Sequence, residues 1–140
     1  MSRLLYFIIF CLIPFSLVSA QEQTNEKGIQ WLNFEQAVAS NDVAPKKIFI
    51  DMYTHWCGWC KRMDATTFEN PEVVSYINKY FYAVKFDAET KDSVLFKDKY
   101  FQFKPEYKSN ELAALLMNGK MSYPTSVYLD GESNLIGPVP

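Results

Sequence analysis

The stretch "DMYTHWCGWCKRM", residues 51–63, places Cys57 and Cys60 two residues apart in a chain that has three cysteines. The residues just before this pair, 48–52, form a short, dense apolar run, which is typical of a strand buried on both faces. The residues from Cys60 to Phe68 have helical spacing. We therefore expect the cysteine pair at the junction between a buried strand and a helix.

A cysteine pair this close can form a structural disulfide, bind a metal or take part in redox chemistry. A structural disulfide here would stabilise the fold little, because closing so short a loop removes little entropy from the unfolded chain. A structural zinc site needs four ligands, and His55 is the only histidine that could add to the two cysteines. Zinc binding and an inert buried pair therefore remain as alternatives that the residues favour less than redox chemistry.

Redox chemistry has a direct physical basis at this position. Unpaired N–H groups and the helix dipole favour an anion at a helix N-terminus, and they lower the pKa of a cysteine there. We therefore expect Cys57 to be the nucleophile that forms a mixed disulfide, and Cys60, one turn further on, to resolve it. The redox-active group would be the Cys57–Cys60 disulfide itself, so no metal and no organic cofactor is expected.

Length and composition indicate one globular domain. The 140 residues are enough to bury a core. Apolar residues make up 49% of the chain and aromatic residues 16%, which argues against disorder. The net charge is −2 and no dense basic stripe is present, so nucleic-acid binding is not expected.

Residues 1–20, "MSRLLYFIIFCLIPFSLVSA", have the pattern of a secretory signal peptide. Arg3 precedes an apolar run, and small residues end at Ala20, after which we expect cleavage. An uncleaved membrane anchor is the alternative, but the run is short and Pro14 interrupts it. A lipid anchor on Cys11 is disfavoured because this cysteine lies inside the apolar run. Export would lead to an oxidising compartment, where disulfides persist.

The rest of the chain divides into a polar leader, residues 21–28, and one domain, residues 29–140. Helices are expected at 29–42, 60–68, 69–81, 92–101 and 111–120, strands at 48–52, 81–89, 125–129 and from 134 onward, and a hairpin turn at 130–133. Asn70 and Pro71 suit the cap and the first residue of the third helix. Gly119 suits the end of the last helix.

This order of elements, a βαβ unit followed by a β-hairpin, predicts an α/β fold with a central mixed sheet. A sheet of this kind would need a further helix over the face that is left open. We therefore expect that the chain is truncated at its C-terminus or lacks the closing helix.

Several segments resemble the thioredoxin superfamily. Residues 48–61, "IFIDMYTHWCGWCK", are similar to its strand and Trp-Cys-x-x-Cys-Lys motif, residues 122–125, "SYPT", to its cis-proline loop, and residues 83–89, "AVKFDAE", to its third strand. Residues 66–74, "TTFENPEVV", are similar to the C-terminal domain of the transmembrane reductase DsbD. The resemblance covers about residues 30–136 and implies a thioredoxin fold with three layers, α/β/α.

The resemblance implies a role for two charged residues. Asp51 would be the buried acid behind the resolving cysteine and would take the proton of Cys60. Burial would raise its pKa, which suits a proton acceptor. Lys85 would be its ion partner. The alternatives are that Asp51 only caps a turn and that Lys85 points to solvent.

The resemblance also implies a docking surface beside the cysteines. Pro124 would be cis rather than an ordinary trans proline, with Tyr123 facing the cysteines. The backbone of Tyr123 or Thr125 would then bind a substrate strand. Trp56 and Trp59 would form an apolar rim for a partner, although a packing role for Trp56 is the alternative.

The chain departs from the superfamily pattern at several points. The dipeptide between the cysteines is Gly58-Trp59 instead of Gly-Pro, which leaves the redox potential open. We place Gly58 with the substrate-contacting residues. The long span before Pro124 is expected to hold an extra helical segment near residues 105–118. His55 is expected to be an exposed loop residue rather than a catalytic base.

Together these features predict an exported, periplasmic thiol:disulfide oxidoreductase that acts as a reductase or an isomerase. The expected partners are proteins with cysteines and a membrane-bound thiol electron donor, and we expect a monomer. A disulfide-donating oxidase and a chaperone-like binding module without turnover are the alternatives.

Overall fold

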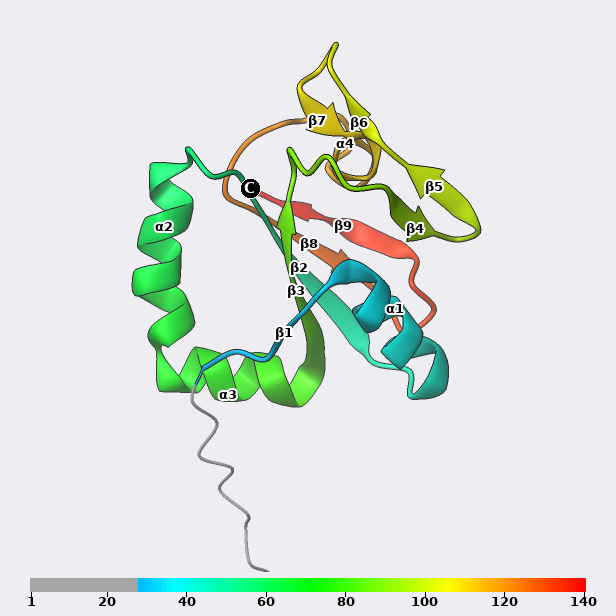
Figure 1. Cartoon of the computed structure of the whole chain (residues 1–140). Helices are drawn as coiled ribbons and strands as arrows, with labels where there is room; N and C mark the ends of the chain where they lie inside the picture. Colours follow the sequence, from blue (N-terminus) through cyan, green and yellow to red (C-terminus); the bar gives the residue numbers. More distant parts are fainter. Residues whose placement is uncertain (1–27) are drawn as a thin grey trace, which may run out of the picture.

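The computed structural model describes residues 28–140, which form a central sheet with helices on both sides (Figure 1). The signal peptide predicted at 1–20 and nearly all of the predicted leader lie outside the described residues. The helical elements are α1 (Phe34–Val43), α2 (Gly58–Ala65), the 3-10 turn η1 (Thr67–Glu69), α3 (Pro71–Tyr80) and α4 (Glu111–Leu116). The strands are β1 (Trp31–Leu32), β2 (Lys47–Tyr53), β3 (Phe81–Asp87), β4 (Val94–Phe96), β5 (Lys99–Phe101), β6 (Phe103–Lys104), β7 (Ser109–Asn110), β8 (Thr125–Leu129) and β9 (Leu135–Val139).

The main sheet has the strand order β1-β3-β2-β8-β9. Its central strand, β2, is parallel to β3 and antiparallel to β8. The segment α2, η1 and α3 connects β2 to β3 as the predicted crossover, and β8 and β9 form the predicted hairpin. The predicted α/β fold with a central mixed sheet is therefore confirmed.

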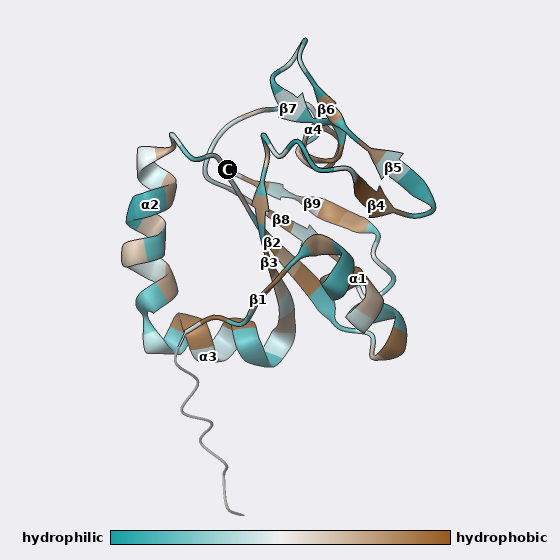
Figure 2. Cartoon of the chain, in the orientation of Figure 1, coloured by the Kyte–Doolittle hydropathy of each residue, from teal (hydrophilic) through white to brown (hydrophobic). Residues whose placement is uncertain are grey.

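The two faces of the sheet pack against different helices, because alternate residues of a strand point to opposite sides. The larger core cluster combines side chains of α1, α4, β4 and β5 with three residues of β2, which are Ile48, Ile50 and Met52. Phe49 faces the other way and packs with Phe68 and Ile77. Figure 2 shows brown, apolar positions in the central strands and mainly teal or pale positions along α2. Asp51 alternates in step with Phe49, so its carboxyl group lies on the side of α2 and α3.

The helix α3 begins as predicted. Asn70 is its N-cap and accepts hydrogen bonds from the backbone N–H groups of Glu72, at 2.8 Å, and Val73, at 3.4 Å. Pro71 is the first helical residue, where its missing N–H costs no hydrogen bond.

The predicted start of the first helix was wrong. Residues Trp31–Leu32 form β1, a short strand parallel to β3. The Trp31 ring packs edge to face on Phe68, with ring centroids 5.2 Å apart. The helix begins only at Phe34, because Asn33 caps it by accepting the N–H of Gln36 at 2.8 Å.

The helix predicted at 92–101 was also wrong, because this segment is the β4–β5 hairpin. Val94 and Phe96 are buried while Leu95 between them is exposed, which is the period of a strand. Lys97 and Asp98 have φ angles of 48° and 61°, so they form the turn in the left-handed region. A helix could not pass through these two residues.

The extra helical segment predicted near 105–118 is helical only in α4, Glu111–Leu116. Before α4, β6 and β7 form a second small hairpin. This helix ends at Leu116, earlier than the predicted end near Gly119. Asn118, with φ 53°, and Gly119, with φ +74°, follow in the left-handed region, and the Gly119 N–H donates to Ala114 O at 2.8 Å. The predicted truncation, or lack of a closing helix, stays a prediction. Among residues 28–140 no helix is long and apolar enough to cross a bilayer.

Candidate active site

Cys57 and Cys60 form a disulfide at the start of α2. Cys57 is the N-cap of this helix, and the backbone N–H of Cys60 donates to Cys57 Sγ over 3.0 Å. The Cys57 N–H in turn donates to Thr54 O over 3.1 Å, which fixes the loop that leads out of β2. The predicted placement of the pair, at a strand end and a helix N-terminus, is confirmed.

Both cysteines are buried, with exposed fractions of 4% for Cys57 and 2% for Cys60. The residues beside them are not: Trp56 is 66% exposed and Trp59 is 68% exposed. The Arg62 guanidinium lies 5.4 Å from the centre of the Trp59 ring. The predicted apolar rim is therefore exposed beside the buried sulfurs, and its use by a partner stays a prediction.

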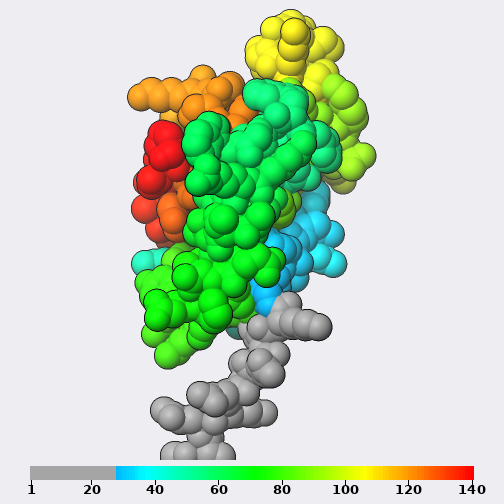
Figure 3. Space-filling model, turned by 90° about the vertical axis from the view of Figure 1, so that its left-hand side faces the viewer, coloured from blue at the N-terminus to red at the C-terminus, as the bar shows by residue number. Residues whose placement is uncertain are grey.

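The loop before β8 lies against the same rim. Trp56 meets Tyr123 edge to face, with ring centroids 5.8 Å apart, and the Tyr123–Pro124 peptide bond is cis, as predicted. Thr125 is buried and its hydroxyl donates to Ser122 O over 2.8 Å. Figure 3 shows the segment before β8 (orange) beside α2 (green). The structure thus brings the two predicted docking segments together.

Gly58 occupies the first position of α2 without any steric need for glycine. A side-chain Cβ at this position would have no heavy atom within 4 Å. The predicted contact between Gly58 and substrate stays a prediction, as does the effect of the Gly58-Trp59 dipeptide on the potential.

Asp51 is fully buried on β2 and is paired with Lys85, its parallel neighbour on β3. The Lys85 ammonium donates to Asp51 Oδ2 over 2.9 Å. The other carboxylate oxygen, Oδ1, is buried and has no hydrogen-bond partner among the described residues. Burial raises the pKa of Asp51, and the Lys85 ammonium offsets part of that increase. The predicted ion pair is present, and Asp51 keeps an oxygen that can accept a proton.

Asp64, which sequence reasoning missed, is a second partner of the same ammonium. The Lys85 ammonium also donates to Asp64 Oδ1, on α2. Burial alone would lower the pKa of Lys85, but Asp64 and Asp51 together raise it. The signal was available: Asp64 follows Cys60 by four residues, and residues at this spacing share a helix face.

Two further carboxylates hold the loop before Cys57. Glu89 accepts a hydrogen bond from Trp56 Nε1 over 3.1 Å, and Asp87 Oδ2 lies 3.3 Å from His55 Nε2. His55 is 78% exposed, in agreement with the predicted loop position. Asp87 and Glu89 come at the end of β3, beside the end of the parallel strand β2, and that adjacency could have pointed to them.

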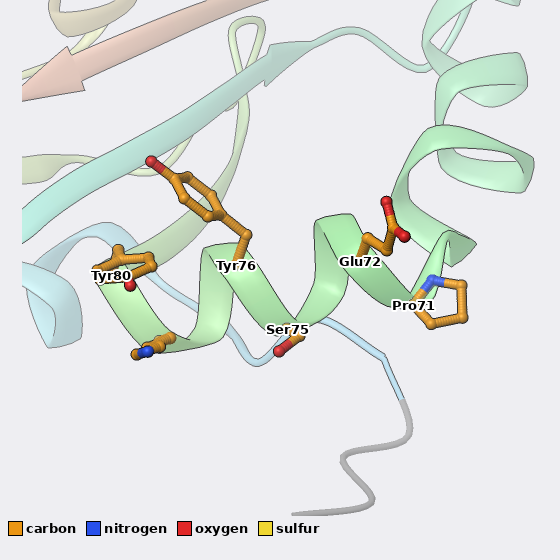
Figure 4. Close-up of a pocket in the computed structure, with 6 residues that line it drawn as sticks. Pro71, Glu72, Ser75, Tyr76 and Tyr80 are labelled. Carbon is orange, nitrogen blue, oxygen red and sulfur yellow. The ribbon is translucent and has the colours of Figure 1, made fainter.

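One further surface feature shares no residue with this site. A shallow pocket on α3 is lined by residues of that helix alone, which are Pro71, Glu72, Ser75, Tyr76, Lys79 and Tyr80 (Figure 4). Within residues 28–140, no three side chains from His, Cys, Asp and Glu lie together as metal ligands would.

The fold and the site define a thioredoxin-fold protein with a cysteine pair at a helix N-terminus. The family model Thioredox_DsbH, described as a protein of unknown function, DUF255, matches residues 19–136, so the chain belongs to this family. The predicted thioredoxin-like character is confirmed. No curated protein matches the chain.

Solved structures match with low sequence identity and therefore support the fold alone. "DsbH Oxidoreductase" has 19% identity, with 79% of this chain and 72% of that chain covered and a TM-score of 0.57. A proposed disulphide isomerase from Bacteroides thetaiotaomicron has 24% identity, with 80% and 79% covered and a TM-score of 0.55. A thioredoxin from Thermus thermophilus has 17% identity, with 80% and 75% covered and a TM-score of 0.59.

Proposed function

We propose that this protein is a thiol:disulfide oxidoreductase that exchanges electrons with protein cysteines through Cys57 and Cys60. The observation that carries the proposal is the hydrogen bond from the Cys60 N–H to Cys57 Sγ at the N-terminus of α2. In the reduced protein the same N–H group and the helix dipole stabilise a thiolate at Cys57. Only the thiolate form of a cysteine is a nucleophile.

The reducing direction starts with the Cys57 thiolate. Its sulfur attacks a disulfide of the partner, a Cys57–partner mixed disulfide forms, and the partner's other sulfur leaves as a thiolate that takes up a proton. Cys60 then gives its thiol proton to Asp51, and its sulfur attacks Cys57 Sγ. The mixed disulfide breaks, the second partner thiol is released, and the Cys57–Cys60 disulfide forms. Two electrons have passed from the protein to its partner.

We propose the reductase or isomerase direction. The resemblance of residues 66–74 to a reductase domain supports this choice. One fold relative is named as a proposed disulphide isomerase, which also supports it. A redox titration of the Cys57–Cys60 pair decides between this role and disulfide donation. A potential of about −270 mV supports reduction, and one of about −120 mV supports disulfide donation.

Export to the periplasm, a membrane-bound thiol donor and a monomeric state belong to the same proposal. The signal-like segment at 1–20 supports export, and the need for electrons outside the cytoplasm supports a membrane-bound donor. Fractionation of cells that express the full chain tests export. Size-exclusion chromatography with light scattering tests the monomer.

A chaperone-like binding module is the second candidate, and the exposed rings of Trp56 and Trp59 favour it. Insulin reduction in the presence of a chemical thiol donor separates the two functions. We expect the wild-type protein to reduce insulin and Cys57→Ser to be inactive. Equal turnover by both proteins would reject the redox proposal.

A trap variant tests the assignment of the two cysteines. Cys60→Ser keeps the Cys57 nucleophile but removes the resolving sulfur, so mixed disulfides with partners should accumulate. Cys57→Ser is the matched control and should accumulate none. Mixed disulfides that form through Cys60 instead would reverse the assignment.

A further inference from the structure

Lys85 lies between two carboxylates that come from different layers of the fold. Asp51 reaches it from the central strand β2, and Asp64 reaches it from α2, the helix that begins at Cys57. One ammonium thus serves two carboxylates. Asp51 is fully buried, whereas the Asp64 side chain keeps 41% of its surface exposed.

The surroundings of the ammonium hold it in place between these two partners. Three aromatic rings lie 5.1–5.5 Å from Lys85 Nζ, from Trp31, Tyr53 and Phe68. Tyr53 adds a titratable hydroxyl, and burial, followed by the charge of Asp87, raises its pKa, so it stays neutral near pH 7. The charged groups that face Lys85 from the packed elements are therefore Asp51 and Asp64.

We propose that Asp64 is a positioning residue for the thiol chemistry, because it shares the Lys85 ammonium with Asp51 and so keeps Asp51 able to accept the proton of Cys60. The inference rests on the proposed function. If Lys85 were bound to Asp51 alone, its full positive charge would stabilise the Asp51 carboxylate. A carboxylate stabilised in this way is a weak base. Burial is the main cause that raises the pKa of Asp51, and the negative charge of Asp64 adds a smaller effect in the same direction, which is the direction that this sharing requires.

The same contact gives Asp64 a structural alternative, which is to anchor α2 to the sheet. An isosteric change separates the two roles. Asp64→Asn keeps an oxygen that can accept from Lys85 but removes the charge. A loss of anchoring would slow the exchange by the same factor at every pH, whereas a loss of charge would move the pH profile.

The test is a pair of pH titrations on the reduced full-length protein, wild type against Asp64→Asn. Glu69→Gln is the matched control, because it removes one exposed carboxylate from η1, the turn that follows α2. The protein is labelled with ¹³C at the aspartate side chains, and the NMR signal of the Asp51 carboxylate reports its titration directly. The rate of reduction of oxidised glutathione from pH 4 to pH 9 reports the chemistry.

We expect Asp51 to titrate at lower pH in Asp64→Asn and at the wild-type pH in Glu69→Gln. The exchange rate of Asp64→Asn should exceed that of the wild type severalfold at the acid end and fall below it at the alkaline end, since Asp51 becomes a weaker base. An Asp51 titration that stays in place, or a rate lowered equally at all pH values, would overturn the inference. If the wild type itself reduces neither insulin nor glutathione, the proposed function fails. If the wild type is active and the Asp51 titration does not move, only the role of Asp64 fails.

Discussion

Trp56, the residue before Cys57, meets Tyr123 edge to face, one from the loop after β2 and the other from the loop before β8. Their ring centroids are 5.8 Å apart, and Glu89 holds the Trp56 indole N–H from a third segment. The rim around the cysteines is therefore built by segments that lie far apart in the sequence. Its shape depends on the sheet that holds these segments together.

Truncation of the rim should weaken exchange with proteins more than exchange with small disulfides. In Trp56→Ala the pair with Tyr123 is lost, and such pairs contribute about 0.5–1.5 kcal/mol beyond burial. We expect kcat/KM for insulin to fall by about three- to tenfold, with little change for oxidised glutathione. Tyr107→Ala, at an exposed aromatic residue outside this rim, is the control. An equal loss with both substrates would assign Trp56 to packing instead of docking.

Removal of the Lys85 cation should destabilise the protein in a pH-dependent way. In Lys85→Met the buried Asp51 carboxylate loses its ion partner, and we expect the free energy of unfolding at pH 8 to fall by about 2 kcal/mol. The value is lower than for a fully buried pair because Lys85 is partly exposed.

The sign of the pH effect follows from linkage. The folded-state pKa of Asp51 already lies above its ordinary value, and it should rise further in Lys85→Met. A folded state that binds the proton more tightly loses stability as pH rises through that pKa. Urea unfolding at pH 5 and pH 8 should therefore show a smaller loss at pH 5. Lys61→Met, at an exposed base on α2, is the control. Equal losses at both pH values would contradict the buried-charge explanation.

Two glycines should respond in opposite ways to alanine. At Gly58 an added Cβ meets nothing within 4 Å, and the helix favours alanine. We expect Gly58→Ala to raise the free energy of unfolding by about 0.5 kcal/mol. Gly119 has φ +74°, a conformation that L residues rarely adopt, so Gly119→Ala should lower it by about 1 kcal/mol. Chemical denaturation of the two oxidised variants measures their free energies of unfolding. A change in the same direction for both variants would contradict the backbone argument.

The cap of α3 should matter for stability and not for exchange. Asn70→Ala removes the acceptor for two backbone N–H groups at the start of the helix, at a cost of about 1 kcal/mol. Insulin reduction at 25 °C should be unchanged. Asn70→Asp keeps an acceptor oxygen and should retain most of the stability. A comparable loss in Asn70→Asp would show that the side-chain cap is not the cause.

The parts of the fold that could be predicted are those decided by neighbouring residues. The apolar run of β2 and the Asn70-Pro71 start of α3 each carry their own local signal. The region 92–110 carries none that is specific. Its apolar residues suit a helix as well as a strand, and the choice depends on Lys97 and Asp98 adopting a left-handed turn, which neither residue type indicates.

The same limit applies to the site. Cys57, Cys60 and Asp51 lie on one continuous segment, and the resemblance of that segment to the thioredoxin superfamily indicated a common chemistry. Asp64, on α2, is linked to the site only through Lys85, which contacts it from β3. Trp56 and Glu89 likewise meet only because β2 and β3 end side by side.

The sulfur of Cys57 fills the position that a serine, threonine or aspartate oxygen fills at the start of most helices. The reactive atom is thus also part of the helix's own architecture, and the choice of knock-out is not neutral. Serine at this position keeps an oxygen that can accept a hydrogen bond from the Cys60 N–H, whereas alanine leaves that N–H without this acceptor. An inactive alanine variant would therefore confuse lost reactivity with a frayed helix, and the serine variant separates the two.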